Sequence, residues 1–149
     1  MRAMALDLGE KRCGIAASDA TGTVAHPLAV LPTQELLQNA SSFRRLLQDY
    51  EVELFVVGLP VSLDGFENAQ AERIRRQASK LEELYKLPVT FFDERLSSKE
   101  AKNVLRQLGY SEKDMKAKTD KIAASILLQT WLDKSANEPM LYEQEGTND

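Results

Sequence analysis

The segment AMALDLGEKRCGIAAS, residues 3–18, decides the fold because it places two apolar runs on either side of a polar turn. Residues 3–8 and 13–18 are rich in apolar side chains, and Gly9 opens the turn between them. This arrangement predicts a β-hairpin at the start of a sheet. Asp7 interrupts the first run, so its carboxylate needs compensation by a cation, a hydrogen-bond network or a metal ion.

Outward from this hairpin, the chain alternates between strand and helix patterns. The expected elements are a third strand at 24–31, an amphipathic helix at 33–50 with Thr33 as its N-cap, a buried strand at 54–59, a helix from 71 to about 86, a strand at 89–92, a helix from 97 or 98 to 108, a loop at 111–118 and a last helix with Thr119 as its N-cap. The buried side of the last helix is expected to contain Ile122, Ala123, Ile126, Leu127, Thr130 and Trp131.

Three early strands followed by alternating helices and strands predict an α/β fold, with a mixed five-stranded sheet flanked by helices. The 149 residues fit one domain, expected at 1–135, followed by an acidic and flexible tail at 136–149. Functional sites in such sheets form beyond the carboxyl ends of the strands. Asp7 and Glu94 both lie near predicted strand ends.

The composition excludes several classes of protein. A single cysteine, Cys13, cannot form an internal disulfide, and with the single histidine, His26, it cannot supply a Cys/His zinc site. One histidine also leaves little room for imidazole chemistry. The longest apolar run, 54–61, is far shorter than the roughly 20 residues that span a bilayer, and no signal peptide is visible, so we expect a cytoplasmic protein.

Charge is unevenly distributed along the chain. The formal net charge of −4 argues against a uniformly basic nucleic-acid coat, but residues 95–121 hold eight basic and four acidic side chains. Such a block could attract phosphates, although a solvated helix face is the plainer interpretation. A second basic cluster contains Arg73, Arg75, Arg76 and Lys80.

Three carboxylates lie in short, otherwise apolar neighbourhoods: Asp7, Glu94 and Asp120. Each has a structural explanation of its own, as a turn residue, a strand-end ion pair and a helix-dipole partner, respectively. Together they could converge on one face of the sheet. Mg²⁺ and Mn²⁺ prefer oxygen ligands, and a pair of such ions can promote phosphodiester cleavage.

Four ordered blocks of the chain resemble a known family. DLGEKRCG (residues 7–14) is similar to the D-x-G-x-x-R-x-G signature of the YqgF family, whose members are described as pre-16S rRNA nucleases or Holliday junction resolvases. The blocks VGLP (57–60), DERLSS (93–98) and KTDKIAASILLQ (118–129) resemble its later motifs, and the likeness extends over about 4–132.

The resemblance implies an RNase H-like fold and assigns Asp7, Glu94 and Asp120 as catalytic metal ligands for Mg²⁺ or Mn²⁺, with two ions expected. It implies that Arg12 and Arg95 lie near the scissile phosphate or hold the acids in place. Lys99, Lys118 and Lys121 belong to the basic block and would then bind the substrate backbone. Gly9 and Gly14 would allow close backbone approach beside the first strand.

The expected function is metal-dependent cleavage of structured RNA, in processing of the 5′ end of pre-16S rRNA during ribosome biogenesis. Alternatives are a resolvase acting on four-way DNA, a nucleotide-binding phosphotransferase, and a non-catalytic RNA- or ribosome-binding factor. A monomer and a homodimer both remain open.

Two further parts of the chain bear on substrate contacts. Tyr110, beside Gly109 and the lysine-rich segment, is a candidate for stacking on an unpaired base, with ordinary packing as the alternative. Ser62 and Phe66 stand where the family more often has Asn and a small hydroxyl residue. That difference makes this loop a point of departure from the family pattern.

Overall fold

A five-stranded mixed sheet forms the centre of the computed structural model, which describes residues 1–60, 66–93, 99–116 and 120–137. The strands are β1 (Ala3–Leu8), β2 (Arg12–Ser18), β3 (Ala25–Pro32), β4 (Leu54–Leu59) and β5 (Val89–Asp93). Their order is β3-β2-β1-β4-β5, with β1, β2 and β3 antiparallel and β1, β4 and β5 parallel. The predicted α/β fold and its N-terminal hairpin are therefore confirmed.

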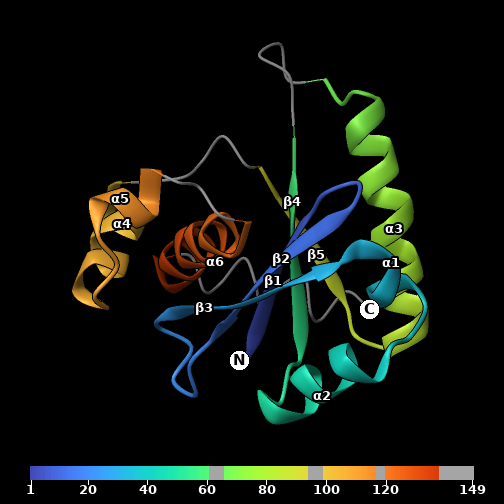
Figure 1. Cartoon of the computed structure of the whole chain (residues 1–149), viewed down its shortest axis with the longest axis horizontal. Coiled ribbons are helices and arrows are strands. Elements are labelled where there is room, and N and C mark those ends of the chain that lie inside the picture. Colours follow the sequence, from blue (N-terminus) through green and yellow to red (C-terminus); the bar gives the residue numbers. More distant parts are fainter. Residues whose placement is uncertain (61–65, 94–98, 117–119, 138–149) are drawn as a thin grey trace.

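Helices cover both faces of the sheet (Figure 1). They are α1 (Thr33–Leu37), α2 (Ser41–Asp49), α3 (Ala69–Tyr85), α4 (Lys99–Gln107), α5 (Glu112–Lys116) and α6 (Asp120–Asn137). The helices α1, α2 and α3 lie on one face, and α6 lies on the other, with α4 packed against α6. No helix of the described ranges is long and apolar enough to cross a membrane.

The two faces of the sheet differ in side-chain size. Met4 and Leu6 of β1 point into the larger core, while Ala3 and Ala5 point toward α6 because successive strand residues face opposite sides. Small residues on the α6 side bring this helix close to the sheet. Asp7, the next residue in the alternation after Ala5, shares the α6 side.

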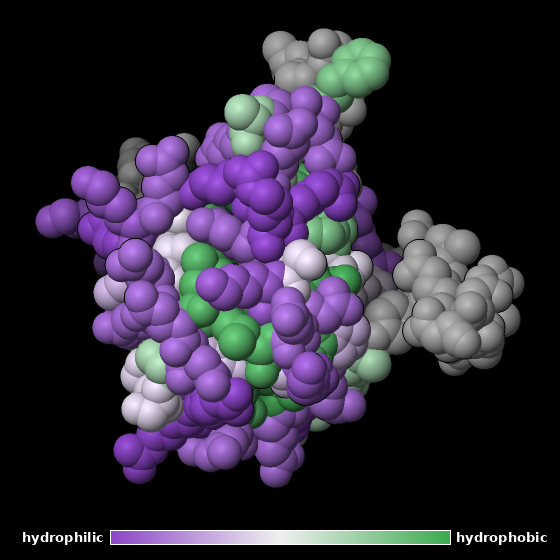
Figure 2. Space-filling model, turned by 90° about the vertical axis from the view of Figure 1, so that its right-hand side faces the viewer, coloured by the Kyte–Doolittle hydropathy of each residue, from purple (hydrophilic) through white to green (hydrophobic). Residues whose placement is uncertain are grey.

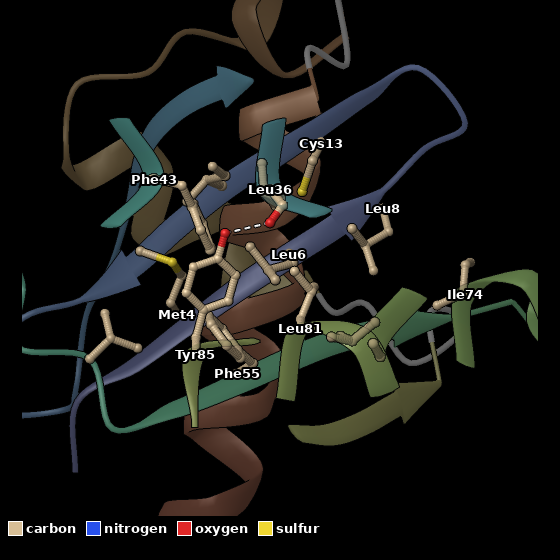
Figure 3. Close-up of a cluster of buried hydrophobic side chains, with 14 of the residues drawn as sticks. Met4, Leu6, Leu8, Cys13, Leu36, Phe43, Phe55, Ile74, Leu81 and Tyr85 are labelled. Carbon is tan, nitrogen blue, oxygen red and sulfur yellow. Dashed lines mark hydrogen bonds between the residues drawn. The ribbon is translucent and has the colours of Figure 1, made fainter. Parts of the chain in front are cut away.

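Aromatic side chains fill the larger core. Phe43, Phe55 and Tyr85 contact one another with ring centroids 5.0–6.3 Å apart. The Tyr85 hydroxyl donates a hydrogen bond to the Leu36 carbonyl (Figure 3). This bond satisfies a buried polar pair and ties α1 to α3. From the α3 side, the surface is mostly hydrophilic around a narrow apolar band (Figure 2).

The single helix predicted at 33–50 is wrong, because the chain forms α1 and α2 with a break between them. Asn39 adopts a left-handed backbone conformation with φ of 62°, which a continuous right-handed helix does not allow. Thr33 begins α1 but does not cap it. Its hydroxyl instead donates to the Gly9 carbonyl at 2.8 Å, and its amide donates to Lys11, so α1 holds the turn of the β1–β2 hairpin.

The loop predicted at 111–118 is also wrong in part, since α5 occupies Glu112–Lys116. The Ser111 hydroxyl accepts from the Asp114 amide, and the Asp114 carboxylate accepts from the Ser111 amide at 2.8 Å. This reciprocal pair is a capping box, and its spacing was readable in the sequence. Thr119 and residues 138–149 of the predicted tail lie outside the described residues.

Helix α6 is buried on more sides than the sequence predicted. Ala124, Leu127 and Leu128 pack on the sheet, whereas Ile122 packs with Leu105 of α4. Ala123, Ile126 and Trp131, which the apolar spacing places on the buried side, are only half-buried. The prediction assumed one apolar stripe, but α6 lies between the sheet and α4, so two stripes are covered.

Two contacts fix α6 along its length. Near the middle, the Gln129 side chain accepts from the Ala25 amide and donates to the Thr23 carbonyl, both at 2.9 Å. At the start, a Cβ placed on Gly14 of β2 would lie 2.0 Å from the Asp120 carbonyl oxygen. The first turn of α6 therefore rests on the backbone of β2 at a residue without a side chain.

Replacing this glycine should displace the start of α6. We expect Gly14→Ala to lower the free energy of unfolding by about 3 kcal/mol, since a methyl group would overlap backbone atoms that only a helix shift can move. Gly109→Ala is the control: φ of 100° strains that residue, but nothing lies within 4 Å of its Cβ, so a loss of about 1 kcal/mol is expected. Urea unfolding measures both, and a Gly14→Ala loss no larger than the control would contradict the contact.

Candidate functional site

Asp7 lies near the carboxyl end of β1, on the α6 side of the sheet. It pairs with Gly14 across the β1–β2 ladder and is half-buried. Within the described part of the chain, no side chain donates a hydrogen bond to this carboxylate or forms an ion pair with it. Of the three forms of compensation expected from the sequence, the described residues thus provide neither the cation nor the hydrogen-bond network.

Asp120 reaches the same place from the other end of the sequence. It is the first residue of α6, and its backbone lies against Gly14, the residue that faces Asp7 in the ladder. The missing side chain at position 14 therefore brings the two acids together. A carboxylate in the first turn of a helix also interacts favourably with the helix dipole.

The pKa of Asp7 is raised for two reasons. Burial raises the pKa of Asp7 above its ordinary value of 3.8, and the charge of Asp120 raises the pKa of Asp7 further. Both causes disfavour the ionised form, because burial removes water and a like charge repels. A bound cation would relieve both, so this pair of oxygen donors suits a hard divalent ion.

Arg12 lies beside this pair at the start of β2. Its Nε is 3.6 Å from an Asp120 carboxylate oxygen, and 74% of its side chain is exposed. An ion pair this exposed adds little stability. The guanidinium is therefore exposed to solvent while it remains close to Asp120.

Cys13 can be excluded as a nucleophile. It is fully buried in the larger core, and burial raises the pKa of its thiol well above 9.0, with the charges of Asp7 and Asp120 raising it further. A thiol that stays protonated is a poor nucleophile. The interpretation of Cys13 as a packed strand residue is confirmed.

The structure describes only part of the predicted site. Lys121, the second residue of α6, is half-buried beside Asp120. Glu94, Arg95 and Lys118 lie outside the described residues, as does the side chain of Lys99 at the start of α4. Among the residues that are described, no group of three His, Cys, Asp or Glu side chains could hold a metal ion. Of the three proposed ligands, the structure therefore describes Asp7 and Asp120.

Arg73 is a neighbour of the site that the sequence interpretation missed. From α3, on the opposite face of the sheet, its Nη2 donates to the carbonyl of Leu8 at 3.4 Å. Its Nη1 is buried and has no hydrogen-bond partner among the residues that the structure describes. The sequence showed only a basic cluster on a helix, which gave no signal that one member turns inward to the end of β1.

Known proteins resemble this chain over nearly its whole length. The family described as RuvX, Holliday junction resolvase, matches residues 1–134. A protein of Syntrophomonas wolfei named "Putative pre-16S rRNA nuclease" is 44% identical over 133 residues, which cover 89% of this chain and 94% of that protein. A protein of Crocosphaera subtropica with the same name is 38% identical over 132 residues, covering 89% and 92%.

Solved structures support the fold. Thermus thermophilus RuvC aligns with a TM-score of 0.55 at 12% identity, covering 91% of this chain and 97% of that one. The same protein in complex with a Holliday junction substrate aligns with a TM-score of 0.54 at 11% identity, covering 91% and 96%. At this identity the likeness concerns the fold, and it confirms the RNase H-like class.

The motif resemblance, the family match and the curated relatives agree along the same residues. The matched range includes the hairpin that carries Asp7, the VGLP block (57–60) at the end of β4, and the start of α6. On this evidence the chain belongs to the RuvX family.

Proposed function

We propose that this protein is a metal-dependent nuclease that cleaves phosphodiester bonds in structured RNA, in processing of the 5′ end of pre-16S rRNA. The observation that carries the proposal is the meeting of Asp7 and Asp120 over Gly14, in a half-buried place where none of the described residues sets a cationic side chain on Asp7. The names of the curated relatives support the RNA substrate. Processing of ribosomal RNA also agrees with the predicted cytoplasmic location.

Asp7, Asp120 and Glu94 would hold Mg²⁺ or Mn²⁺ in this proposal. Support for Glu94 comes from Phe92, two residues earlier, which packs on the α6 side of the sheet with the other two acids. When bound, such ions lower the pKa of water and stabilise the charge that develops on the leaving oxygen.

The chain's own residues would position the substrate. Arg12, exposed beside Asp120, would contact the phosphate next to the cleaved bond. Lys121 and the proposed contacts Arg95, Lys99 and Lys118 would bind the flanking backbone, which fixes register without reading sequence. Gly9 and Thr33 hold the turn that carries Arg12.

Cleavage of four-way DNA is the second candidate, favoured by the description of the matched family and by the fold of RuvC. A resolvase needs two active sites on one junction and hence a stable dimer, whereas an RNA-processing enzyme can act as a monomer. Cleavage of a four-way junction in preference to a 5′-extended 16S rRNA fragment would favour the resolvase, and light scattering would give the oligomeric state.

Removing one carboxylate tests the proposed chemistry. We expect Asp7→Asn to reduce cleavage of a 5′-extended 16S rRNA fragment on the order of 100-fold or more, because a charge that stabilises the transition state through the metal is lost. EDTA should abolish cleavage by the wild type. The control is Asp49→Asn, an exposed carboxylate at the end of α2, which should cleave normally.

Retained cleavage in Asp7→Asn would refute the catalytic assignment. A different result would identify the chain as an RNA-binding factor. In that case the wild type would cleave neither RNA nor junction DNA with Mg²⁺ or Mn²⁺, and the wild type and Asp7→Asn would bind RNA equally well.

The raised pKa of Asp7 makes a second prediction, about stability. The folded state holds the Asp7 proton more tightly than the unfolded state. The contribution of Asp7 to the free energy of unfolding therefore falls as the pH rises from 3.8 through the raised pKa, and it is constant above that range. In EDTA, Asp7→Asn should therefore be more stable than the wild type at pH 7, and this advantage should shrink toward pH 3. Added Mg²⁺ should stabilise the wild type more than the variant.

Urea unfolding at both pH values measures the difference. A variant that is less stable than the wild type at pH 7 without metal would contradict the electrostatic account of this site.

A further inference from the structure

Tyr110 does not supply the stacking contact that the sequence suggested. Its ring packs against Leu105 of α4 and Ile122 of α6, as the packing interpretation of this residue expected. Cationic side chains are therefore the better candidates for further contacts with a nucleic-acid backbone.

The turn between β1 and β2, residues 9–12, presents two neighbouring cationic side chains on the surface, Lys11 and Arg12. Both residues are exposed. Among the described residues Lys11 forms no ion pair, and Arg12 has only the open contact with Asp120 at 3.6 Å. Neither charge is therefore neutralised by a buried partner within the described part of the chain.

Hydrogen bonds hold the backbone of this exposed turn. The Thr33 hydroxyl donates to the Gly9 carbonyl at 2.8 Å, and the Thr33 amide donates to the Lys11 carbonyl at 2.9 Å. The Gly9 amide donates to the Arg12 carbonyl at 2.9 Å, which closes the turn. Thr33 itself is only 2% exposed. A buried side chain is thus bonded to the turn that carries both cations.

The two ends of the turn are also in close contact. A Cβ placed on Gly9 would lie 2.6 Å from the Arg12 carbonyl oxygen. Arg12 pairs with Pro32, the last residue of β3, and Thr33 follows it directly at the start of α1. The end of β3 and the start of α1 therefore hold the turn together.

A turn that is ordered before binding makes its side chains more effective. Ordering a mobile backbone on binding costs conformational entropy, and a turn that is already fixed avoids that cost. Two cations on neighbouring residues also match the closely spaced negative charges of a nucleic-acid strand. Glu10 of the same turn is exposed and opposes such binding, so its charge provides a control of opposite sign.

We propose that the turn at 9–12 is a phosphate clamp, in which Lys11 binds a second substrate phosphate beside the one that Arg12 contacts. The Thr33 hydroxyl is its positioning residue, because it holds the backbone that carries both cations. This inference rests on the proposed nuclease function, and it adds Lys11 and Thr33 to the residues that determine substrate binding. Contacts of this kind fix the register of the RNA without reading its sequence.

The salt dependence of binding tests the clamp. All proteins carry Asp7→Asn and are titrated onto the 5′-extended 16S rRNA fragment at constant Mg²⁺ and several KCl concentrations. Each phosphate contact contributes about 0.7 to 0.9 to the slope of log K against log salt concentration. We expect Lys11→Gln to lower the slope by about this amount and to weaken binding about fivefold at low salt. Glu10→Gln should instead strengthen binding, because it removes a repulsive charge.

The positioning role of Thr33 is tested in the same assay. Thr33→Val keeps the shape of the side chain without the hydroxyl, so it should lower the slope, and Thr33→Ser should restore it. After both cations are replaced by Gln, Thr33→Val should have no further effect. The control is Thr130→Val, since Thr130 is also 2% exposed and donates to the Ile126 carbonyl at 2.8 Å, and its loss should leave the slope unchanged.

An unchanged slope in Lys11→Gln would overturn the clamp, and this exposed residue can be replaced without disturbing the core. A slope in Thr33→Val equal to that of the parent, or further weakening after both cations are removed, would overturn the positioning role. Cleavage by the wild type, with Asp7 intact, tests the nuclease function separately, so the two proposals can fail independently.

Discussion

The absence of a side chain at Gly14 is the constraint on which the rest of the structure depends. A single methyl group there would overlap the backbone at the start of α6, so the helix could not rest on β2 as it does. Alanines at neighbouring positions on the same side of the sheet let the rest of α6 follow closely. Gln129 then fixes the helix along its axis by bonding to Thr23 and Ala25, on either side of Val24 where β3 begins.

The same contact creates the electrostatic problem that defines the site. Asp7 and Asp120 come from opposite ends of the sequence and meet where burial already disfavours the ionised form of Asp7. Such an arrangement costs stability in the free protein, since a like charge and lost hydration both oppose ionisation. A site that is unfavourable by itself and favourable with a bound cation is the pattern expected of a metal-binding centre.

The sequence predicted the sheet well because strand alternation and buried apolar runs depend on local composition. It failed where one residue breaks a pattern: apolar spacing continued through Asn39, and only the left-handed backbone there separates α1 from α2. The lack of apolar periodicity at 111–118 favoured a loop, although the Ser111 and Asp114 spacing of the capping box is local to the sequence. The inward turn of Arg73 had no local signal, because its partner lies on β1.

For the site, the acids could be singled out because charges in apolar surroundings need an explanation. Their meeting could not be derived from spacing, since it depends on packing between the first hairpin and the last helix. The family resemblance suggested it, and the geometry at Gly14 gives its physical cause.

The central claim is that Asp7 and Asp120 form one cation site, and paramagnetic NMR with Mn²⁺ tests it most directly. The account predicts that the signals of both carboxylates broaden together with one dissociation constant, and that replacing either residue with Asn removes the broadening at the other. Broadening at one carboxylate alone, or broadening at Asp120 that persists unchanged in the Asp7→Asn protein, would contradict the account.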